Sequence, residues 1–411
     1  MKVSGAIYRS LLCAMLYAFH PALHAIDNFS FSGFGSLGMG KINRDDVKFM
    51  GYDDSWSFRS DTMLGLQAQA DISDRWSATT QIVSRGFNFD DTSDFEPTLE
   101  WLFASYQVSP EARIRFGRMR TPLYLLSESL EVGYSYPWVR PPVDTYTFLL
   151  TSLSNFNGVD LSTNVDFANS DLDIQVFAGA SQGKYIDFDL DFYALFGANF
   201  KYHWNSLTLR YGVTIAKTDA SSASLDPIID AYQQFAPLDP IFAELADSHS
   251  TEGAWFQYHG LGLQWDYGHW SLIAEQYATL GPNEDFANDS YGGYISLSRQ
   301  IGRFTPYAVI GYYKNVFSDD ISTLITQSEA IIPPGNIPQL DGLRKIDQQV
   351  ASQFDEDGRT YTLGLRYELF TQAALKLEVE YFDSNALMSG DDLDQKPDET
   401  VLTSIVIDVV F

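Results

Sequence analysis

The sequence predicts an all-β protein, a transmembrane antiparallel β-barrel of about 16 strands, and three observations support this fold class. Segments of roughly ten residues with alternating apolar and polar side chains recur from residue 28 to the C-terminus. Aromatic residues make up 15% of the chain, which suits a barrel with aromatic girdles at both membrane interfaces. After the first 25 residues no apolar window of about 20 residues remains, so no transmembrane helix is predicted.

The N-terminus has the features of a secretory signal peptide. Two basic residues, Lys2 and Arg9, precede a mostly apolar stretch at 11–19, and a plausible cleavage site ends at Ala25. We therefore predict a signal peptide over 1–25 and a single barrel domain over 26–411. The one cysteine, Cys13, lies inside this peptide, so no disulfide framework is expected in the mature chain.

The alternating segments divide the chain into sixteen predicted strands. The second strand is very regular, with leucine and alanine on one face and glutamine and aspartate on the other. An even number of strands places both termini on the periplasmic side. The predicted strands are 28–42, 56–73, 76–88, 98–109, 112–122, 153–167, 172–182, 192–204, 207–219, 254–267, 269–281, 290–301, 304–317, 358–370, 373–386 and 398–411.

The glycines of the first strand, GFGSLGMGK at 33–41, resemble a nucleotide-binding loop. Such a loop needs a helix after it, because the helix N-terminus holds the phosphate. Here a polar loop follows, and the period of two continues from Phe29 through the glycines to Met39. We therefore assign the glycines to a strand, where they relieve crowding or allow a kink.

Seven of the predicted connections are short turns, and eight are longer loops expected outside the cell. The fifth long loop, 220–253, contains Asp226-Pro227 and Asp239-Pro240, and Asp followed by Pro is typical of a helix start. We expect two short helices there, with a mobile loop as the alternative. The seventh long loop, 318–357, is expected to hold a helix over 343–353.

The last strand carries a second targeting signal, in addition to the signal peptide. Ile405, Ile407, Val409 and Phe411 share one face, and the chain ends on the aromatic residue. This resembles the C-terminal assembly signal of bacterial outer-membrane barrels, and it implies recognition by the barrel-assembly machinery. The alternative is the ordinary last strand of a soluble β protein.

The architecture resembles that of the Gram-negative porin superfamily, including the 16-stranded general and substrate-selective porins. Locally the resemblance lies in DTMLGLQA at 61–68, QIVSR at 81–85, FGRMRTP at 116–122 and Phe411. It implies that the third long loop, about 122–152, folds into the lumen. There, arginines on the wall would face carboxylates on the loop and set up a transverse field.

The charged residues fit this expectation. Alternation puts two arginines on the inner faces of the second and third strands, and a slip at Gly117, as at a bulge, would turn two more inward and Met119 outward. The alternative is that these arginines pair with neighbouring carboxylates to fill the wall. The predicted wall residues are Arg59, Arg85, Arg118 and Arg120, and the predicted loop residues are Glu128, Glu131, Tyr134, Tyr136, Trp138, Arg140 and Asp144.

The resemblance implies a water-filled channel for passive diffusion of small hydrophilic solutes and ions. Because the loop is rich in aromatic residues, we hypothesise a preference for small organic solutes. A plugged structural or adhesive barrel is one alternative. A rim-active enzyme is another alternative. We expect no catalytic residues, no cofactor and no metal.

The formal net charge of −28 argues against nucleic acid as a partner. Most of the acidic residues lie in the predicted loops, where they form a solvated surface or, alternatively, hold divalent cations that bridge to lipopolysaccharide. We expect the outer-membrane lipid as the surroundings of the barrel. The resemblance alone implies a homotrimer.

Overall fold

The computed structural model describes residues 28–46, 48–87, 95–146, 153–185, 188–222, 226–250, 253–281, 289–316, 319–354, 356–384 and 399–411. The predicted signal peptide lies outside the described residues, as does the end of the predicted third loop, 147–152.

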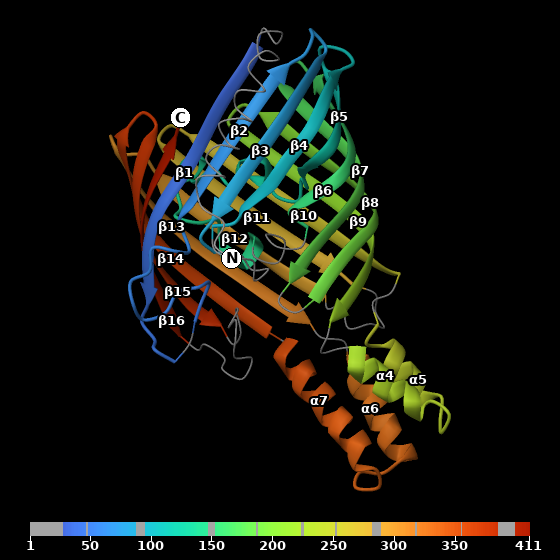
Figure 1. Ribbon diagram of the computed structural model, residues 1–411. Helices are drawn as coiled ribbons and strands as arrows, with labels where there is room; N and C mark the ends of the chain where they lie inside the picture. The colour runs from blue at the N-terminus through green and yellow to red at the C-terminus, as the bar shows by residue number, and fades with distance from the viewer. Residues whose placement is uncertain are drawn as a thin grey trace, which may run out of the picture.

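The described strands form one closed antiparallel barrel, in which each strand pairs with its neighbours in sequence and β1 pairs with β16 (Figure 1). The predicted fold class and strand number are confirmed. The strands are β1 Asn28–Ile42, β2 Met63–Asp71, β3 Trp76–Arg85, β4 Pro97–Gln107, β5 Ala112–Arg120, β6 Asn155–Asp166, β7 Ser170–Tyr185, β8 Phe188–Trp204, β9 Leu207–Ser222, β10 Ala254–Tyr267, β11 Trp270–Leu280, β12 Asp289–Arg299, β13 Phe304–Val316, β14 Glu356–Phe370, β15 Ala373–Ser384 and β16 Thr400–Val410.

The two faces of the barrel wall differ in chemistry. In β12, Ile295 and Leu297 are 60% and 45% exposed on the outside, whereas Ser296 and Ser298 between them are buried on the inside. An apolar outer face suits contact with lipid, and closure of the barrel pairs the backbone groups that an open edge would leave unsatisfied there.

The chain between β1 and β2 explains the glycines of the first strand. A Cβ atom at Gly38 would lie 2.4 Å from the Cβ of Asp61. The hydroxyl of Thr62 contacts the backbone of Gly38 and accepts from its N–H at 3.1 Å. Glycine therefore lets the segment before β2 pack directly on β1. The predicted second strand started too early for the same reason, since residues 56–62 form this irregular packing and not a strand.

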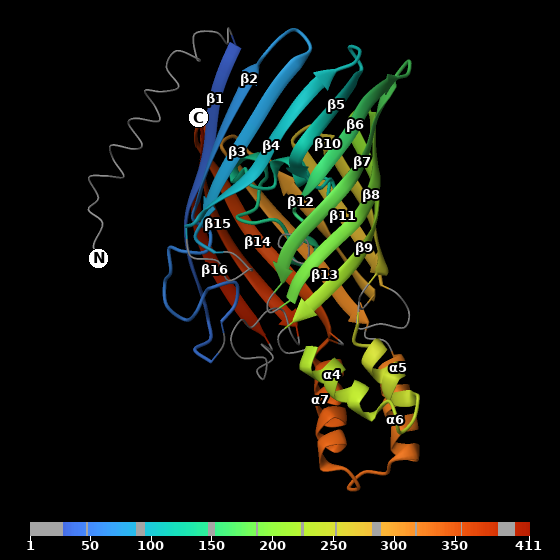
Figure 2. The ribbon, with the colours of Figure 1, turned by 45° about the vertical axis from the view of Figure 1, so that its right-hand side comes forward.

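In the described residues, four helices form a bundle, called the cap here, that projects from one side of the long-loop end of the barrel (Figure 2). They are α4 Asp226–Phe235, α5 Ile241–Asp247, α6 Asp319–Ile331 and α7 Pro338–Phe354. The cap has its own apolar core, which includes Phe242, Leu245 and Leu340. Helices α4 and α5 lie in the fifth long loop, where two were predicted; α7 contains the predicted helix 343–353, and α6 was not predicted. No helix in the described ranges is long and apolar enough to cross a membrane.

Candidate functional site

The third-loop segment, defined here as residues 122–146, is attached to the inner face of the wall by polar contacts. It contains two short 3-10 helices, η1 Ser127–Ser129 and η2 Gly133–Ser135. Three bonds show its reach: the N–H of Leu125 donates to Glu275 of β11 at 2.7 Å, Trp138 Nε1 donates to Ser296 of β12 at 2.8 Å, and Thr360 of β14 donates to Asp144 at 2.8 Å. The segment therefore touches strands far apart around the barrel.

Arg140 anchors the segment where β15, β16 and the chain before β2 meet. It is 8% exposed, and its guanidinium pairs with Asp61 Oδ2 at 2.6 Å, with Glu378 Oε1 at 3.6 Å and with Glu380. It also donates to Ser404 Oγ at 2.6 Å. These carboxylates offset the cost of burying the guanidinium. If the loop were removed, the carboxylates would lose the positive charge that compensates them.

Lys376 provides a second anchor, from the wall towards the segment. Its side chain is fully buried, and Nζ donates to the carbonyl oxygens of Gly133 at 2.6 Å and Trp138 at 2.5 Å. It also pairs with Asp408 Oδ2 at 2.8 Å, and the other oxygen of Asp408 accepts from Ser36 Oγ at 2.5 Å. One lysine thus links the segment to β15, β16 and β1.

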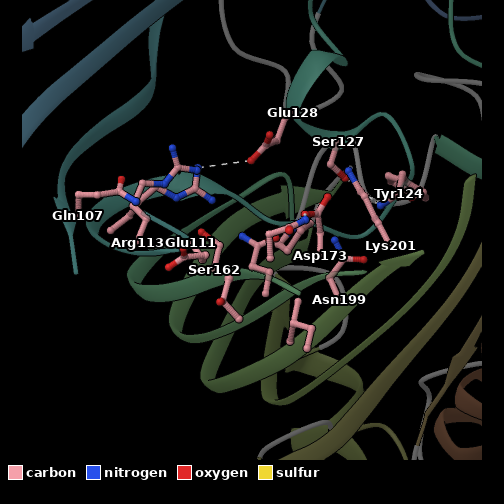
Figure 3. A pocket seen from close by; sticks show the side chains of 16 residues that line it. Gln107, Glu111, Arg113, Tyr124, Ser127, Glu128, Ser162, Asp173, Asn199 and Lys201 are labelled. Carbon is pink, nitrogen blue, oxygen red and sulfur yellow. Dashed lines mark hydrogen bonds and ion pairs between the residues drawn. The ribbon is translucent and has the colours of Figure 1, made fainter. Parts of the chain in front are cut away.

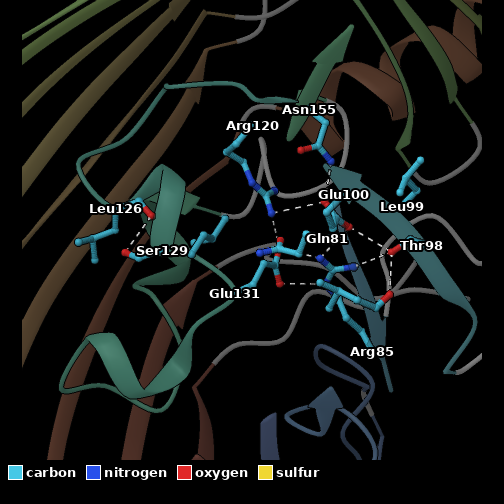
Figure 4. A network of polar contacts seen from close by, with 12 residues as sticks. Gln81, Arg85, Thr98, Leu99, Glu100, Arg120, Leu126, Ser129, Glu131 and Asn155 are labelled. Carbon is cyan, nitrogen blue, oxygen red and sulfur yellow. Dashed lines mark hydrogen bonds and ion pairs between the residues drawn. The ribbon is translucent and has the colours of Figure 1, made fainter. Parts of the chain in front are cut away.

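Two of the predicted wall arginines meet a predicted loop carboxylate (Figure 4). Glu131 Oε1 lies 2.7 Å from Arg85 Nη2 and 2.8 Å from Arg120 Nη2. Glu100 of β4 joins the cluster at 2.8 Å from Arg85 and 3.4 Å from Arg120, and Asn155 donates to it at 2.6 Å. Burial opposes ionisation of Glu131, but the two arginines outweigh burial and hold the pKa of its carboxyl below the ordinary value.

The other two predicted wall arginines are placed differently. Arg59 precedes β2, is exposed, and donates Nε to the carbonyl of Gly86 at 2.8 Å, so the expectation of a strand position is wrong. Arg118 lies opposite Leu102, which is 55% exposed on the outer face, and donates to the carbonyl of Leu99 at 2.8 Å. The expected inward phase of Arg118 is therefore wrong as well.

The reason for the Arg118 error is that the strand has no slip at Gly117. The pairing of β5 with β4 and with β6 runs through Gly117 without a shift. Met119, expected to point outward, is instead 1% exposed and packs in the main buried cluster. The irregularity lies one hairpin earlier, where the pairing of β3 with β4 shifts between Gln81 and Ile82.

Glu128 meets an arginine that was not among the predicted wall residues. Arg115 of β5 pairs with Glu128 at 3.4 Å and is held by Asp160 of β6, to which its Nε donates at 3.0 Å. Glu128 remains 59% exposed at its side chain. The inward phase of Arg115 was visible in the sequence, but its partner Asp160 became apparent only from the pairing of β5 with β6.

The loop aromatics fill space and make few surfaces for a solute. Tyr136 and Trp138 stack at 5.8 Å between ring centroids and are 4% and 1% exposed. Tyr134 lies at the edge, where its hydroxyl contacts Glu368 at 3.1 Å and the carbonyl of Thr371 at 2.9 Å. The hypothesis that stacked aromatic residues select organic solutes therefore cannot rest on Tyr136 and Trp138, because their rings are buried.

Asp144 is the least satisfied carboxylate of the segment. It is 3% exposed, one oxygen accepts from Thr360, and Oδ2 has no hydrogen-bond partner among the residues described. Burial raises the pKa of the Asp144 carboxyl to about 7. Gly311 of β13 makes room for it, since a Cβ there would overlap the carboxylate.

The four predicted assembly residues close the barrel. Phe411 and Gly33 exchange backbone hydrogen bonds of 2.8 and 2.9 Å. Ile405, Ile407 and Val409 alternate with the buried side chains of β16, and Phe411 is 56% exposed. Their role as an assembly signal stays a prediction.

A cavity of about 320 Å³ lies beside the start of the third-loop segment, against the inner face of β5 to β8 (Figure 3). The segment borders this cavity with Pro122, Tyr124, Ser127 and Glu128.

No family model matches this sequence, and no curated protein matches it. Solved structures do. The anion-selective porin from Comamonas acidovorans matches with 13% identity and a TM-score of 0.56, over 93% of this chain and 99% of that chain. The outer membrane channel DcaP of Acinetobacter baumannii matches with 10% identity and a TM-score of 0.56, over 93% and 97%. The chain has the fold of the outer-membrane porins.

The porin fold is also shared with OmpT of Vibrio cholerae, an outer membrane protein solved in a trimer form. It is 11% identical, with a TM-score of 0.51 over 94% of this chain and all of that chain. Identities this low establish the fold and leave the solute and the assembly to other observations.

Proposed function

We propose that this protein is an outer-membrane porin, a water-filled channel for passive diffusion of small hydrophilic solutes and ions. The observation that carries the proposal is a closed sixteen-stranded barrel with an apolar outside and a charged inside. The third-loop segment narrows the lumen in this proposal, because its contacts with Glu275, Ser296 and Lys376 hold it against inward-facing side chains. The channel catalyses no reaction.

The charge arrangement supports a selective passage. Arg85 and Arg120 on the wall meet Glu131 on the segment, and Arg115 meets Glu128. Ion pairs in a narrow passage of low dielectric act on a passing ion far more strongly than pairs on an open surface. Of these arginines, Arg85 and Arg120 belong to the wall that the sequence predicted, whereas Arg115 does not.

The surroundings follow from the same proposal. The barrel sits in the outer membrane in contact with lipid and lipopolysaccharide, after export and insertion by the barrel-assembly machinery through β16. It assembles as a homotrimer. OmpT of Vibrio cholerae, which has the same fold, was solved in a trimer form. The acidic outer loops remain solvated surface in this view.

A plugged barrel is the second candidate, and one observation favours it. The largest buried cluster joins residues of the third-loop segment, such as Tyr124 and Tyr146, to wall residues such as Tyr258 and Tyr294. This packing fills part of the lumen. A structural barrel would fill the remainder as well.

Single-channel recording in a planar bilayer tests the two candidates. We compare the wild type with a variant in which residues 123–146 are replaced by a short Gly-Ser linker, after confirming that both fold by their heat-dependent mobility in gels. A porin gives ohmic steps, in threes for a trimer, and larger steps in the variant. A silent wild type with a conducting variant identifies a plug, and silence from both overturns the channel function.

A further inference from the structure

In the cavity beside the third-loop segment, the acidic side chains have hydrogen-bonding partners, whereas two of the basic side chains have none among the described residues. Its wall comes from β5 to β8 near the short turns, and its roof is the start of the segment (Figure 3). Among its lining residues are Arg113, Asp173, Asn199, Lys201 and Glu128. A volume of about 320 Å³ is at the lower end of the roughly 300–1,000 Å³ typical of ligand sites. The cavity therefore suits a small metabolite.

The carboxylates of this cavity already have partners. Asp173 contacts His203 Nε2 at 3.1 Å and accepts from Asn164 Nδ2 at 2.8 Å. Glu128 pairs with Arg115, and Glu111 accepts from Ser109 Oγ at 2.9 Å. The acidic groups thus have little need of a ligand.

The basic groups do not have such partners. Within the described part of the chain, neither Lys201 of β8 nor Arg113 of β5 forms an ion pair or side-chain hydrogen bond. Arg210 lies directly opposite Lys201 on β9, is 3% exposed, and donates Nη2 to the carbonyl of Pro122, which lines the cavity. Its Nε and Nη1 have no hydrogen-bond partner among the described residues. The lining carries three acidic and three basic side chains, so its charge is balanced, but the donors of Lys201 and Arg113 have no acceptor among the described residues and could bind an anion.

A buried acceptor completes the site. Asn199 is 5% exposed and lines the cavity, and its Oδ1 has no hydrogen-bond partner among the residues that the structure describes. A buried polar atom without a partner is unfavourable, so a ligand that supplies a donor gains there. The site therefore offers a cationic group for an anion and a neighbouring acceptor for a hydroxyl or amine.

We propose that this cavity is a binding site for small organic acids that carry a carboxylate and a hydroxyl or amino donor. The carboxylate faces Lys201 and Arg113, and the donor group reaches Asn199 Oδ1. The inference rests on the proposed channel function, because the site would delay and select such solutes on their way through the barrel. It names a solute class that the ion pairs at Glu131 and Glu128 do not specify.

The test measures how solutes reduce the chloride current of single channels in a planar bilayer. The probes are lactate, with carboxylate and hydroxyl; propionate, with carboxylate alone; and glycerol, with hydroxyls alone. In the wild type we expect half-reduction of the current at the lowest concentration for lactate, at a several-fold higher one for propionate, and no saturable effect of glycerol. Lactate added on the short-turn side should reduce the current at a lower concentration than lactate added on the other side, because the cavity lies near the short turns.

Two variants and a matched control locate the effect. Lys201→Gln should raise the half-reducing concentration of lactate about tenfold, since a charge-assisted hydrogen bond is lost. Asn199→Leu should remove the preference for lactate over propionate. Lys217→Gln removes the same charge from β9, where Lys217 lies over the exposed Trp255, and should leave the lactate effect unchanged. Equal lactate concentrations for the wild type and Lys201→Gln overturn the proposal.

Calorimetry of the detergent-solubilised protein with lactate separates this inference from the channel function. Lactate binding that Lys201→Gln weakens, in a protein without conductance, supports the site and rejects the porin. Conductance without lactate binding rejects the site and leaves the porin in place.

Discussion

The inner wall of the barrel has two regions that use the same residue types differently. On β15 and β16, Lys376 is fully buried and holds two loop carbonyls and Asp408. On β8, Lys201 occupies an equivalent inward position but lines a cavity. The third-loop segment covers the first region and only borders the second.

The difference shows that the loop decides what an inward charge does. A buried charge needs partners, and the segment supplies them to Lys376 through the carbonyl groups of Gly133 and Trp138. Within the described residues, Lys201 has no such partner on the segment and lines a cavity. The wall at Lys376 therefore fixes the loop, whereas the wall at Lys201 borders an open space.

The largest expected effect comes from breaking the covered region at Lys376. Lys376→Met leaves Asp408 buried without its ammonium partner and should lower the free energy of unfolding by about 3–5 kcal/mol. Urea unfolding in detergent, followed by tryptophan fluorescence, measures the change.

The double variant Lys376→Met with Asp408→Leu is the control, and it should recover most of the loss. Lys201→Gln should change the same free energy by less than about 1 kcal/mol, because its ammonium is not part of the packing. An equal loss for both lysines would contradict the comparison.

A pH-dependent effect is expected at Asp144. Its pKa is raised to about 7 by burial, so the folded state binds a proton that the unfolded state releases near pH 4. The cost of ionising it is absent below that pH, grows between about pH 4 and pH 7, and is constant above. Asp144→Asn should therefore be more stable than the wild type by about 4 kcal/mol at pH 8.

At pH 4 the same Asp144→Asn variant should match the wild type to within about 0.5 kcal/mol, because the carboxyl is then protonated in the folded state and about half protonated in the unfolded state. Unfolding midpoints at the two pH values measure the difference. If the difference in stability between the variant and the wild type were the same at pH 4 and pH 8, the Asp144 carboxyl would not be buried and unsatisfied.

The charged residues at the border of the covered region, Glu131 and Glu128, should have smaller effects on stability, and Glu131 should also affect ion selectivity. Glu131→Gln removes one acid from the cluster of Arg85, Arg120 and Glu100, and should cost about 2 kcal/mol of stability. It should also shift the reversal potential in a salt gradient towards anions, because two arginines then share one carboxylate. Glu128→Gln is the matched control, and its greater exposure predicts a change below about 0.5 kcal/mol.

The smallest effect is expected at the edge of the covered region. Tyr134→Phe removes a hydroxyl that contacts Glu368 and the carbonyl of Thr371, and should cost about 0.5–1.5 kcal/mol. The ring would still lie beside the guanidinium of Arg366, now 4.5 Å from the ring centroid. A loss as large as that of Lys376→Met would show that the segment depends on its edge and not on its buried anchors.

Much of the barrel was predictable because its signal is local. Alternation identifies the strand and its two faces from a few neighbouring residues, so the strands that end at Ile42 and Tyr267 were placed at their observed limits. The prediction failed at Arg59, which lies in irregular chain before β2, and at Arg118, where the expected slip at Gly117 does not occur and regular alternation continues. A register shift lies instead between Gln81 and Ile82, a position that only the pairing of β3 with β4 reveals.

The site was predictable only in part. Arg85, Arg120 and Glu131, which the sequence analysis named, lie in contact, and their role at a pore constriction stays a prediction. The roles of Lys201 and Asn199 could not be read in advance, although their inward phase follows from the same alternation. Whether such a residue is buried or faces a cavity depends on a segment more than fifty residues away in the chain.

The sequence by itself determined the fold class, the number of strands and the inner or outer side of most residues, because a period of two is a short-range property of extended backbone. The tertiary structure alone decided which inward charges become anchors and which face the cavity. That choice depends on where the third-loop segment lies against the wall, and long-range packing and the pairing of buried charges fix that position.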